Sequence, residues 1–177
     1  MSSEFAGKTA GKAALDAGET RRFESLVSQQ GERLIKSLSV IFLDRELAAD
    51  AAQEAFVQLY VHWEEVTARG DPQAWLYRAA VNRGKDYRRG LARAARLFQR
   101  LAEASSEEPG AQDWTPRGEF MSVLSGLPTR QRTAAALYYS ADFSVAEIAA
   151  VMDISEGSVS SHLHRARVAL KQILEAE

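Results

Sequence analysis

Polar side chains near the C-terminal end of the chain have the types and spacing needed to read base edges in DNA. They are Ser158, Ser160, Ser161, His162, His164 and Arg165. Serine hydroxyls bond either bases or phosphates, and an arginine guanidinium can make a bidentate contact with guanine. Residues 158, 161, 162 and 165 would share one side of a helix. The alternative interpretation is a solvated polar helix face.

The residues around this polar face have the pattern of a helix-turn-helix. Ser144 and Glu147 have the capping-box spacing of a helix start. Asp153 tolerates the left-handed backbone that a tight turn requires. The apolar residues of the second helix should face inward, and these are Val159, Leu163, Ala166 and Leu170. Residues 144–174 therefore predict a recognition helix for the major groove, although an ordinary helical hairpin has the same spacing.

A second candidate surface is a basic cluster in the middle of the chain. It contains Arg83, Lys85, Arg88, Arg89, Arg93, Arg96 and Arg100, opposed only by Asp86. A single sign of charge over this length favours contact with phosphate groups. The alternative is a solvated amphipathic helix on which the arginines are incidental.

Helices are expected to position these residues. Asp71 as a cap and Pro72 at the first helical position predict a helix start. Its buried stripe would be Trp75, Leu76, Ala79 and Ala80. We expect residues 82–84 to end this helix, because Asn and Gly accept left-handed geometry. A separate basic helix would follow, with Tyr87, Leu91, Leu97 and Phe98 facing inward.

Other apolar patterns along the chain are also helical. One expected helix carries Phe23, Leu26, Val27, Leu34, Ile35, Leu38 and Ile41. The next, with Asp44 as its N-cap, carries Leu47, Ala51, Ala55, Phe56, Leu59 and Trp63. Beyond residue 116, Phe120, Val123, Leu124 and Leu127 begin a helix, and Pro128 starts another that runs to about Tyr139. No period-two strand pattern occurs, so the predicted fold class is all-α.

Charge and composition divide the chain into two small helical domains. Residues 1–19 are small and polar and should form a disordered tail. Residues 20–101 form the first domain, and residues 117–177 form the second. Residues 102–116 contain Glu103, Glu107, Glu108 and Asp113 without a basic residue. We interpret this segment as a flexible acidic linker and expect the two domains to move independently.

Composition excludes several classes of protein. Among 177 residues there is no cysteine, which excludes disulfides and cysteine-type zinc fingers. No apolar run reaches membrane-spanning length and no signal-peptide core is present, so we expect a cytoplasmic protein without membrane insertion. His162 and His164 are two residues apart on a helix and cannot converge on a metal. No nucleophile–base pair or cofactor motif appears, so we expect neither an enzyme nor a bound cofactor.

Taken together, four segments resemble the extracytoplasmic-function (ECF) sigma factors of the sigma-70 family. They are ADAAQEAFVQLY, WLYRAAVNRGKDYRR, LPTRQR and SVAEIAAVMDISEGSVSSHLHRAR. The resemblance covers residues 22–174, and its specificity comes from the order and spacing of the segments. It implies an alternative sigma factor that binds core RNA polymerase and directs promoter-specific initiation. The first domain would then be a region 2-like bundle, and the second a region 4-like helix-turn-helix domain.

The resemblance also implies roles for particular residues. Asp50, Gln53 and Glu54 would dock on polymerase, although a solvated helix face is the alternative. The melted −10 element would be bound by Asn82, Arg83, Lys85, Arg88 and Arg89. From the sequence alone, Asn82 is equally well explained as a helix C-cap that contacts nothing. Trp75 resembles a family aromatic, but its place on the apolar stripe assigns it to the core.

The predicted −35 surface is the six-residue polar face of the recognition helix, and it departs from the family pattern. Ser160 and His162 stand where Lys or Arg is common, so fewer counterions would be displaced from DNA. The resemblance also implies promoter DNA and an anti-sigma factor as partners. Two other classes stay open: a stand-alone helix-turn-helix transcription regulator, and a helical interaction protein that has lost DNA binding.

Overall fold

The computed structural model describes residues 15–102 and 124–174, where every regular element is a helix. The helices are α1 (Ala17–Phe42), α2 (Arg45–Val61), α3 (Trp63–Arg69), α4 (Pro72–Ala102), α6 (Thr129–Ser140), α7 (Val145–Met152) and α8 (Glu156–Leu174). The predicted all-α class is confirmed. Helix α1 begins at Ala17, so the expected tail boundary at residue 19 is too late. Residues 1–14 and 103–123, with nearly all of the expected linker, lie outside the described residues.

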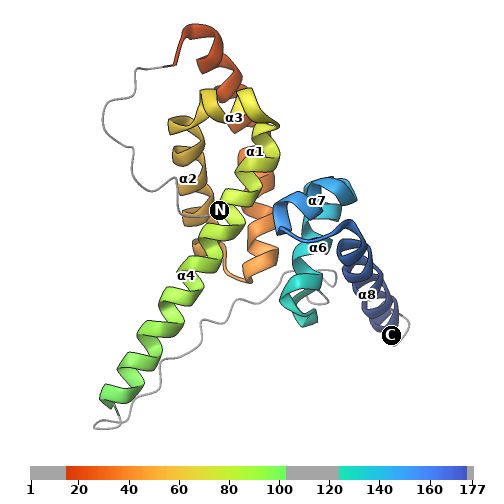
Figure 1. The fold of residues 1–177 in the computed structure, drawn as a ribbon. Helices are drawn as coiled ribbons and strands as arrows, with labels where there is room; N and C mark the ends of the chain where they lie inside the picture. Colours follow the sequence, from red (N-terminus) through yellow and green to blue (C-terminus); the bar gives the residue numbers. More distant parts are fainter. Residues whose placement is uncertain (1–14, 103–123, 175–177) are drawn as a thin grey trace.

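The N-terminal helices form a bundle in which α2 packs against both α1 and α4 (Figure 1). The α2 helix buries a row of alanines, namely Ala48, Ala51, Ala52 and Ala55. Small side chains let the two larger helices approach α2 closely. Leucine and isoleucine side chains fill the remaining space between the helices, and they include Leu34, Leu38, Ile41, Leu59 and Leu76.

Local signals define the helix starts as predicted. The Asp44 carboxylate caps α2 by accepting a hydrogen bond from Leu47 N at 2.9 Å. The Asp71 carboxylate caps α4 in the same way, with Gln73 N at 3.0 Å and Ala74 N at 3.1 Å. Both carboxylates satisfy amide groups that have no partner inside the helix. The predicted caps at Asp44 and Asp71 are therefore confirmed.

The prediction that residues 82–84 end a helix is wrong, because α4 continues without a break from Pro72 to Ala102. Gly84 is buried in the middle of this helix. A Cβ atom at Gly84 would overlap the ring of Phe42, which is only 3% exposed at the end of α1. The glycine thus permits close packing against a remote helix and does not terminate its own.

The outer half of α4 also differs from its predicted orientation. Leu91 and Leu97 were expected to face inward, but they are 64% and 60% exposed. Figure 1 shows why, since this end of α4 extends beyond the other N-terminal helices. The side chain of Phe98 lies outside the described residues. Helical periodicity alone indicated an apolar face here, but no neighbouring helix covers it among the described residues.

The C-terminal helices form the predicted helix-turn-helix. Ser144 Oγ accepts from Glu147 N, and Glu147 Oε2 accepts from Ser144 N at 2.7 Å, so the capping box is confirmed. Asp153 adopts a left-handed conformation with φ 56° in the turn between α7 and α8. Ala149 is buried there, and the 154–149 backbone hydrogen bond closes the turn. The turn therefore forms for the reasons that the sequence indicated.

The two sets of helices contact each other directly. Helix α6 packs against α1, and α7 packs against α4 (Figure 1). The two halves are therefore packed together in the described residues, and their independent motion stays a prediction. None of the described helices has the length and apolar character needed to cross a membrane.

Candidate nucleic-acid interface

The polar face of α8 is exposed and is positioned by a capped helix start. Ser155 Oγ accepts a hydrogen bond from Ser158 N at 3.2 Å and lies 2.9 Å from Ser158 Oγ. Ser161 Oγ donates to Gly157 O at 2.9 Å, and Arg165 is exposed. The opposite face of the helix is anchored in the core by Val159, Leu163 and Ala166. Hydroxyls bonded only to their own helix can turn toward a ligand without leaving a buried group unpaired.

The remaining predicted contacts lie on the same helix. Ser160 and His164 are exposed, and at about 100° per residue they lie on one side of Ser161, opposite Ser158. His162 is partly buried at the edge of this surface. All six predicted residues therefore belong to one helix surface, but they do not point in one direction.

His162 has an unusual environment for a residue of a DNA-facing helix. Its Nδ1 atom is buried without a hydrogen-bond partner. Burial lowers the pKa of His162, and the nearby charges of Arg130 and Arg165 lower it further. The imidazole is therefore neutral near pH 7. Arg130, an exposed residue of α6, adds a positive charge beside α8 that the sequence prediction omitted; no sequence signal placed it there.

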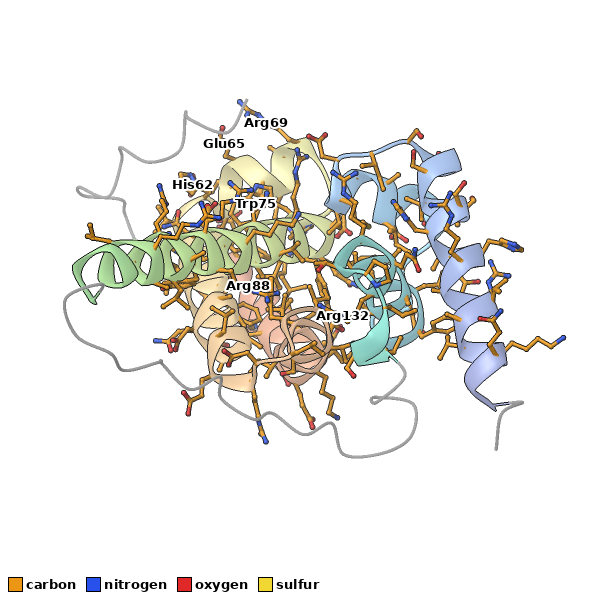
Figure 2. The ribbon with its side chains drawn as sticks, turned by 90° about the horizontal axis from the view of Figure 1, so that it is seen from below. His62, Glu65, Arg69, Trp75, Arg88 and Arg132 are labelled. Carbon is orange, nitrogen blue, oxygen red and sulfur yellow. The ribbon has the colours of Figure 1, made fainter. Side chains whose placement is uncertain are left out.

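The predicted −10 residues spread around α4 because that helix is continuous. Asn82 and Arg89 are exposed, and Arg89 Nη1 lies 3.4 Å from Asp86 Oδ1. Arg78 lies one turn before Asn82 on the same face, and the predicted −10 set did not include it. Trp75 packs against the core but remains partly exposed near His62 (Figure 2), so its assignment to the core holds only in part.

Two further predicted −10 residues, Lys85 and Arg88, interact electrostatically with the C-terminal helices. Lys85 is partly buried, and its pKa is lowered first by burial and then by the charges of Arg89 and Arg130. Arg88 is exposed and acts electrostatically on the buried Arg132 of α6. Both residues are therefore near the C-terminal helices, and the structure does not gather the basic residues of α4 into one patch.

Arg83 and Glu54 were assigned to different sites, but the structure brings them together. Arg83 Nε donates to Glu54 Oε2 at 2.5 Å. The Tyr87 hydroxyl donates to the same oxygen at 3.0 Å. The Arg83 guanidinium also lies 4.6 Å from the centre of the Tyr87 ring, which is a cation–π geometry. These contacts join α2 to α4 and occupy the carboxylate of Glu54.

The other predicted polymerase contacts, Asp50 and Gln53, are exposed on α2. Val57 and Tyr60 lie on the same face and are 55% and 42% exposed. Sequence reasoning missed this pair, although its spacing from Asp50 places it on one side of a helix. The α2 face therefore combines polar and apolar side chains, as protein-binding surfaces commonly do.

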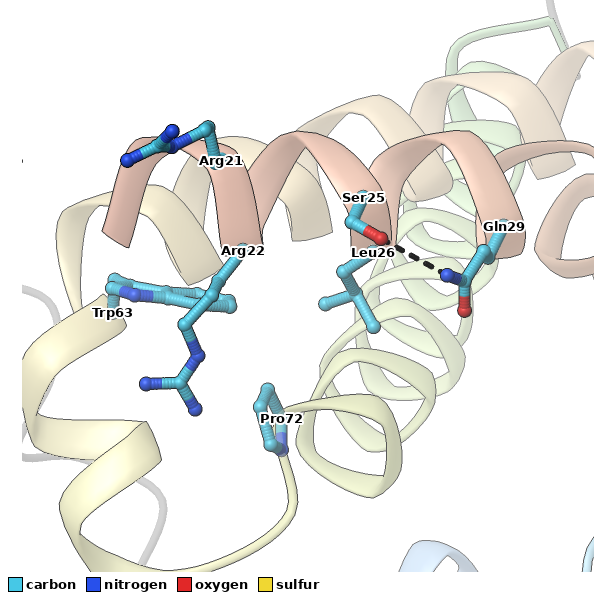
Figure 3. Close-up of a pocket in the computed structure, with 7 residues that line it drawn as sticks. All are labelled: Arg21, Arg22, Ser25, Leu26, Gln29, Trp63 and Pro72. Carbon is cyan, nitrogen blue, oxygen red and sulfur yellow. Dashed lines mark hydrogen bonds between the residues drawn. The ribbon is translucent and has the colours of Figure 1, made fainter. Parts of the chain in front are cut away.

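A separate open hollow of about 380 Å³ lies near the start of α1 (Figure 3). It is lined by Arg21, Arg22, Ser25, Leu26, Gln29, Trp63 and Pro72. None of the predicted site residues lines it, and within it Gln29 Nε2 donates to Ser25 Oγ at 3.0 Å. In the described ranges, no group of three His, Asp or Glu side chains could hold a metal ion.

Comparison with protein families matches both parts of the chain. Sigma-70 region 2 matches residues 26–94, and sigma-70 region 4 matches residues 117–170. The RNA polymerase sigma-E factor of Streptomyces avermitilis is 29% identical over 159 residues, covering 90% of this chain and 88% of that protein. The ECF RNA polymerase sigma factor SigM of Bacillus subtilis is 31% identical over 134 residues, covering 73% of this chain and 81% of SigM.

Two solved structures share this fold. CnrH, solved in complex with the cytosolic domain of CnrY, superposes with a TM-score of 0.63 at 28% identity, covering 91% of this chain and 92% of CnrH. RpoE of Bartonella quintana, solved with the anti-sigma factor NepR, superposes with a TM-score of 0.68 at 18% identity. The match covers 89% of this chain and 99% of RpoE. The chain therefore belongs to the sigma-70 family of RNA polymerase sigma factors and to its ECF group.

Proposed function

We propose how this alternative sigma factor divides promoter recognition among its helices. Helix α2 docks on core RNA polymerase, α4 captures the melted −10 element, and α8 reads the −35 duplex. The observation that supports this division is the order of the two family regions, each of which exposes a polar helix face. In this arrangement the protein places polymerase on DNA and performs no polymerisation itself.

Polymerase docking is assigned to the exposed face of α2. Asp50 and Gln53 are available there, and Val57 and Tyr60 supply apolar area beside them. A carboxylate such as Asp50 can pair with polymerase arginines through charge-assisted hydrogen bonds. Glu54 is already bonded to Arg83, so it contributes at the edge of this face.

Capture of the −10 strand is assigned to the exposed face of α4. Extruding a base from duplex DNA costs a few kcal/mol, which binding of the extruded base offsets. The Asn82 amide offers both a donor and an acceptor to a base edge. The nearby Arg78 and Arg89 can hold the phosphate backbone, with Arg83, Lys85 and Arg88 on the flanks of the helix.

Recognition of the −35 element is assigned to α8. Arg165 is suited to guanine, and the serine hydroxyls are suited to bases or phosphates. With Ser160 and neutral His162 in place of fixed charges, α8 displaces few counterions. Binding by this helix should therefore be weak and only modestly dependent on salt.

The proposed setting is the cytoplasm, where core polymerase and promoter DNA are found. The complex of the similar sigma factor RpoE with the anti-sigma factor NepR supports an anti-sigma factor as a further partner of this chain. Regions 20–101 and 117–177 remain the proposed −10 and −35 domains, with residues 102–116 as the linker between them.

Run-off transcription with purified core polymerase tests the proposed division. Asn82→Ala should impair strand opening more than duplex binding, as measured by permanganate reactivity and by footprinting. Arg165→Ala should weaken −35 recognition by about 1–3 kcal/mol. Arg167→Ala is the matched control, because Arg167 Nε donates to Leu163 O within α8. Equal and negligible effects of Asn82→Ala and Arg165→Ala would contradict the assignments, and a protein that never binds core polymerase would contradict the function.

A further inference from the structure

The contact between the N-terminal and C-terminal helices contains fully buried aromatic side chains. Tyr77 of α4 and Phe143, between α6 and α7, pack edge to face with ring centroids 4.8 Å apart. Tyr77 is 0% exposed and Phe143 is 2% exposed. Burial raises the pKa of Tyr77 to about 12. The two rings form a continuous core across the contact, and separating the helices would expose them to water.

A buried arginine also crosses this contact. Arg132 of α6 is 5% exposed, and its Nε donates to Ile41 O in the last turn of α1 at 3.2 Å. Its Nη1 donates to Ser125 O and Leu127 O, both at 3.0 Å. Carbonyl groups in the last turn of a helix lack partners within it and attract cations. Arg132 therefore completes the end of α1 from the other half of the chain (Figure 2).

Two ion pairs lie at the edge of the contact. Arg33 of α1 pairs with Asp142, and Arg78 of α4 lies 3.8 Å from Asp153 in the helix-turn-helix. All four side chains are substantially exposed, so each pair contributes little free energy. The charges nevertheless match across the contact and fix how the two surfaces align.

The covered surface overlaps the proposed −10 surface. Arg78 lies on the Asn82 face of α4, and its guanidinium is directed to Asp153. Lys85 is partly buried near Arg130 of α6 and Asp153 of the turn between α7 and α8. Both basic groups would otherwise be available for phosphate. Contact with the C-terminal helices therefore competes with the DNA strand for the same side chains.

The geometry of a promoter also conflicts with this contact. The −35 and −10 elements are about 25 base pairs apart by their numbering, which is on the order of 85 Å of duplex at about 3.4 Å per base pair. Arg132 joins α6 to α1 by a single hydrogen bond. The two halves cannot keep this bond and also bind both elements of one promoter.

We infer that the surface formed by α1 and α4 is an intramolecular docking site for α6 and α7. In the free protein this site holds the C-terminal helices over part of the −10 surface, and it must be vacated before initiation. The inference rests on the proposed division of promoter recognition. It gives the chain an inhibitory contact of its own, without any partner protein.

Reversible cross-linking tests this docking site in a chain that has no cysteine. The variant Arg33→Cys/Asp142→Cys is treated with a short bis-maleimide whose spacer contains a cleavable disulfide. The matched control is Glu32→Cys/Lys36→Cys, which cross-links two adjacent turns of α1. We expect efficient intramolecular cross-linking of both variants in the absence of polymerase. The cross-linked test variant should lose run-off product and regain it after reduction, whereas the control should stay active throughout.

Two outcomes overturn the docking site: no intramolecular cross-link in the free test variant, or full initiation by the cross-linked protein. Initiation by the reduced protein reports separately on the proposed function. A charge reversal provides a second measurement. Arg33→Glu places a carboxylate opposite Asp142 and should raise the affinity of free protein for −10 single strands. Lys36→Glu makes the same change in charge where Glu32 is the partner, and equal affinities of the two variants would contradict the docking site.

Discussion

The carboxylate of Glu54 binds Arg83 and Tyr87 within the same chain, whereas Asp50 and Gln53 extend from α2 into solvent. The three residues were grouped because the family resemblance assigns all of them to polymerase docking. Only the packing of α2 against α4 separates their roles. Glu54 positions a guanidinium, and its two neighbours face outward.

A pair of isosteric substitutions separates these roles. Glu54→Gln removes the charge that holds Arg83 and should weaken −10 strand binding by about 1 kcal/mol, a modest effect for a partly exposed pair. Asp50→Asn should instead weaken binding to core polymerase. Fluorescence anisotropy with labelled DNA and with labelled core enzyme measures the two affinities. If Glu54→Gln weakens binding to core polymerase as much as Asp50→Asn does, Glu54 also contacts polymerase and the separation of roles is wrong.

His162 gives the C-terminal helices a dependence on pH. Its pKa in the folded protein lies below the value of about 6.5 in an unfolded chain. The unfolded state therefore takes up a proton first, and the free energy of unfolding should fall as pH decreases below about 6.5. Urea denaturation of His162→Gln should show a smaller decrease between pH 6.5 and 5. His164→Gln, on the exposed side of α8, is the control for replacing a histidine in this helix.

At the scale of single elements, local sequence predicts where helices start but does not predict where they continue without a break. The caps at Asp44, Asp71 and Ser144 depend on residues two or three positions away, so the sequence specifies them directly. The expected break at residues 82–84 is wrong because Gly84 makes room for the ring of Phe42, a remote residue of α1. The exposure of Leu91 and Leu97 is likewise decided by where the neighbouring helices stop.

Gly84→Ala tests the close approach of α1 and α4. Alanine gains about 1 kcal/mol over glycine in a helix interior. The added methyl group overlaps a buried ring, and overpacking typically costs about 1–3 kcal/mol. We expect a net destabilisation of about 1 kcal/mol by urea denaturation. Combined with Phe42→Leu, the same substitution should become stabilising; a Gly84→Ala protein that is more stable on its own would show that the ring moves aside.

At the scale of the whole molecule, the contact between the two halves lies beyond local sequence signals. Arg132 and Ile41 are 91 positions apart, and neither residue type suggests the other. The all-helical class and the helix-turn-helix could be predicted from periodicity and from the capping residues. The docking of one half on the other depends on shape complementarity, which the pattern of residue types does not encode.

The dependence on salt concentration distinguishes the exposed ion pairs of this contact from its buried groups. Raising the salt concentration from about 0.1 to 1 M shortens the screening length from about 10 to 3 Å and weakens the exposed pairs of Arg33 and Arg78. Arg132 and the Tyr77–Phe143 rings are buried and should persist. We expect energy transfer between dyes at Lys36→Cys and Val168→Cys to change little with salt. When Arg132→Met is added, the energy transfer should fall, and circular dichroism checks that α6–α8 remain folded. If energy transfer is instead lost at high salt in the protein that keeps Arg132, the contact depends on surface charge.

The ring of Phe42 against the backbone of Gly84 has a consequence for the evolution of related chains. Two positions in different helices share one small volume, so neither can enlarge unless the other shrinks. Homologues with alanine or a larger residue at position 84 should carry a smaller side chain, or a displaced helix end, at position 42. Covariation between these two columns would mark how far the close crossing of α1 and α4 extends among ECF sigma factors.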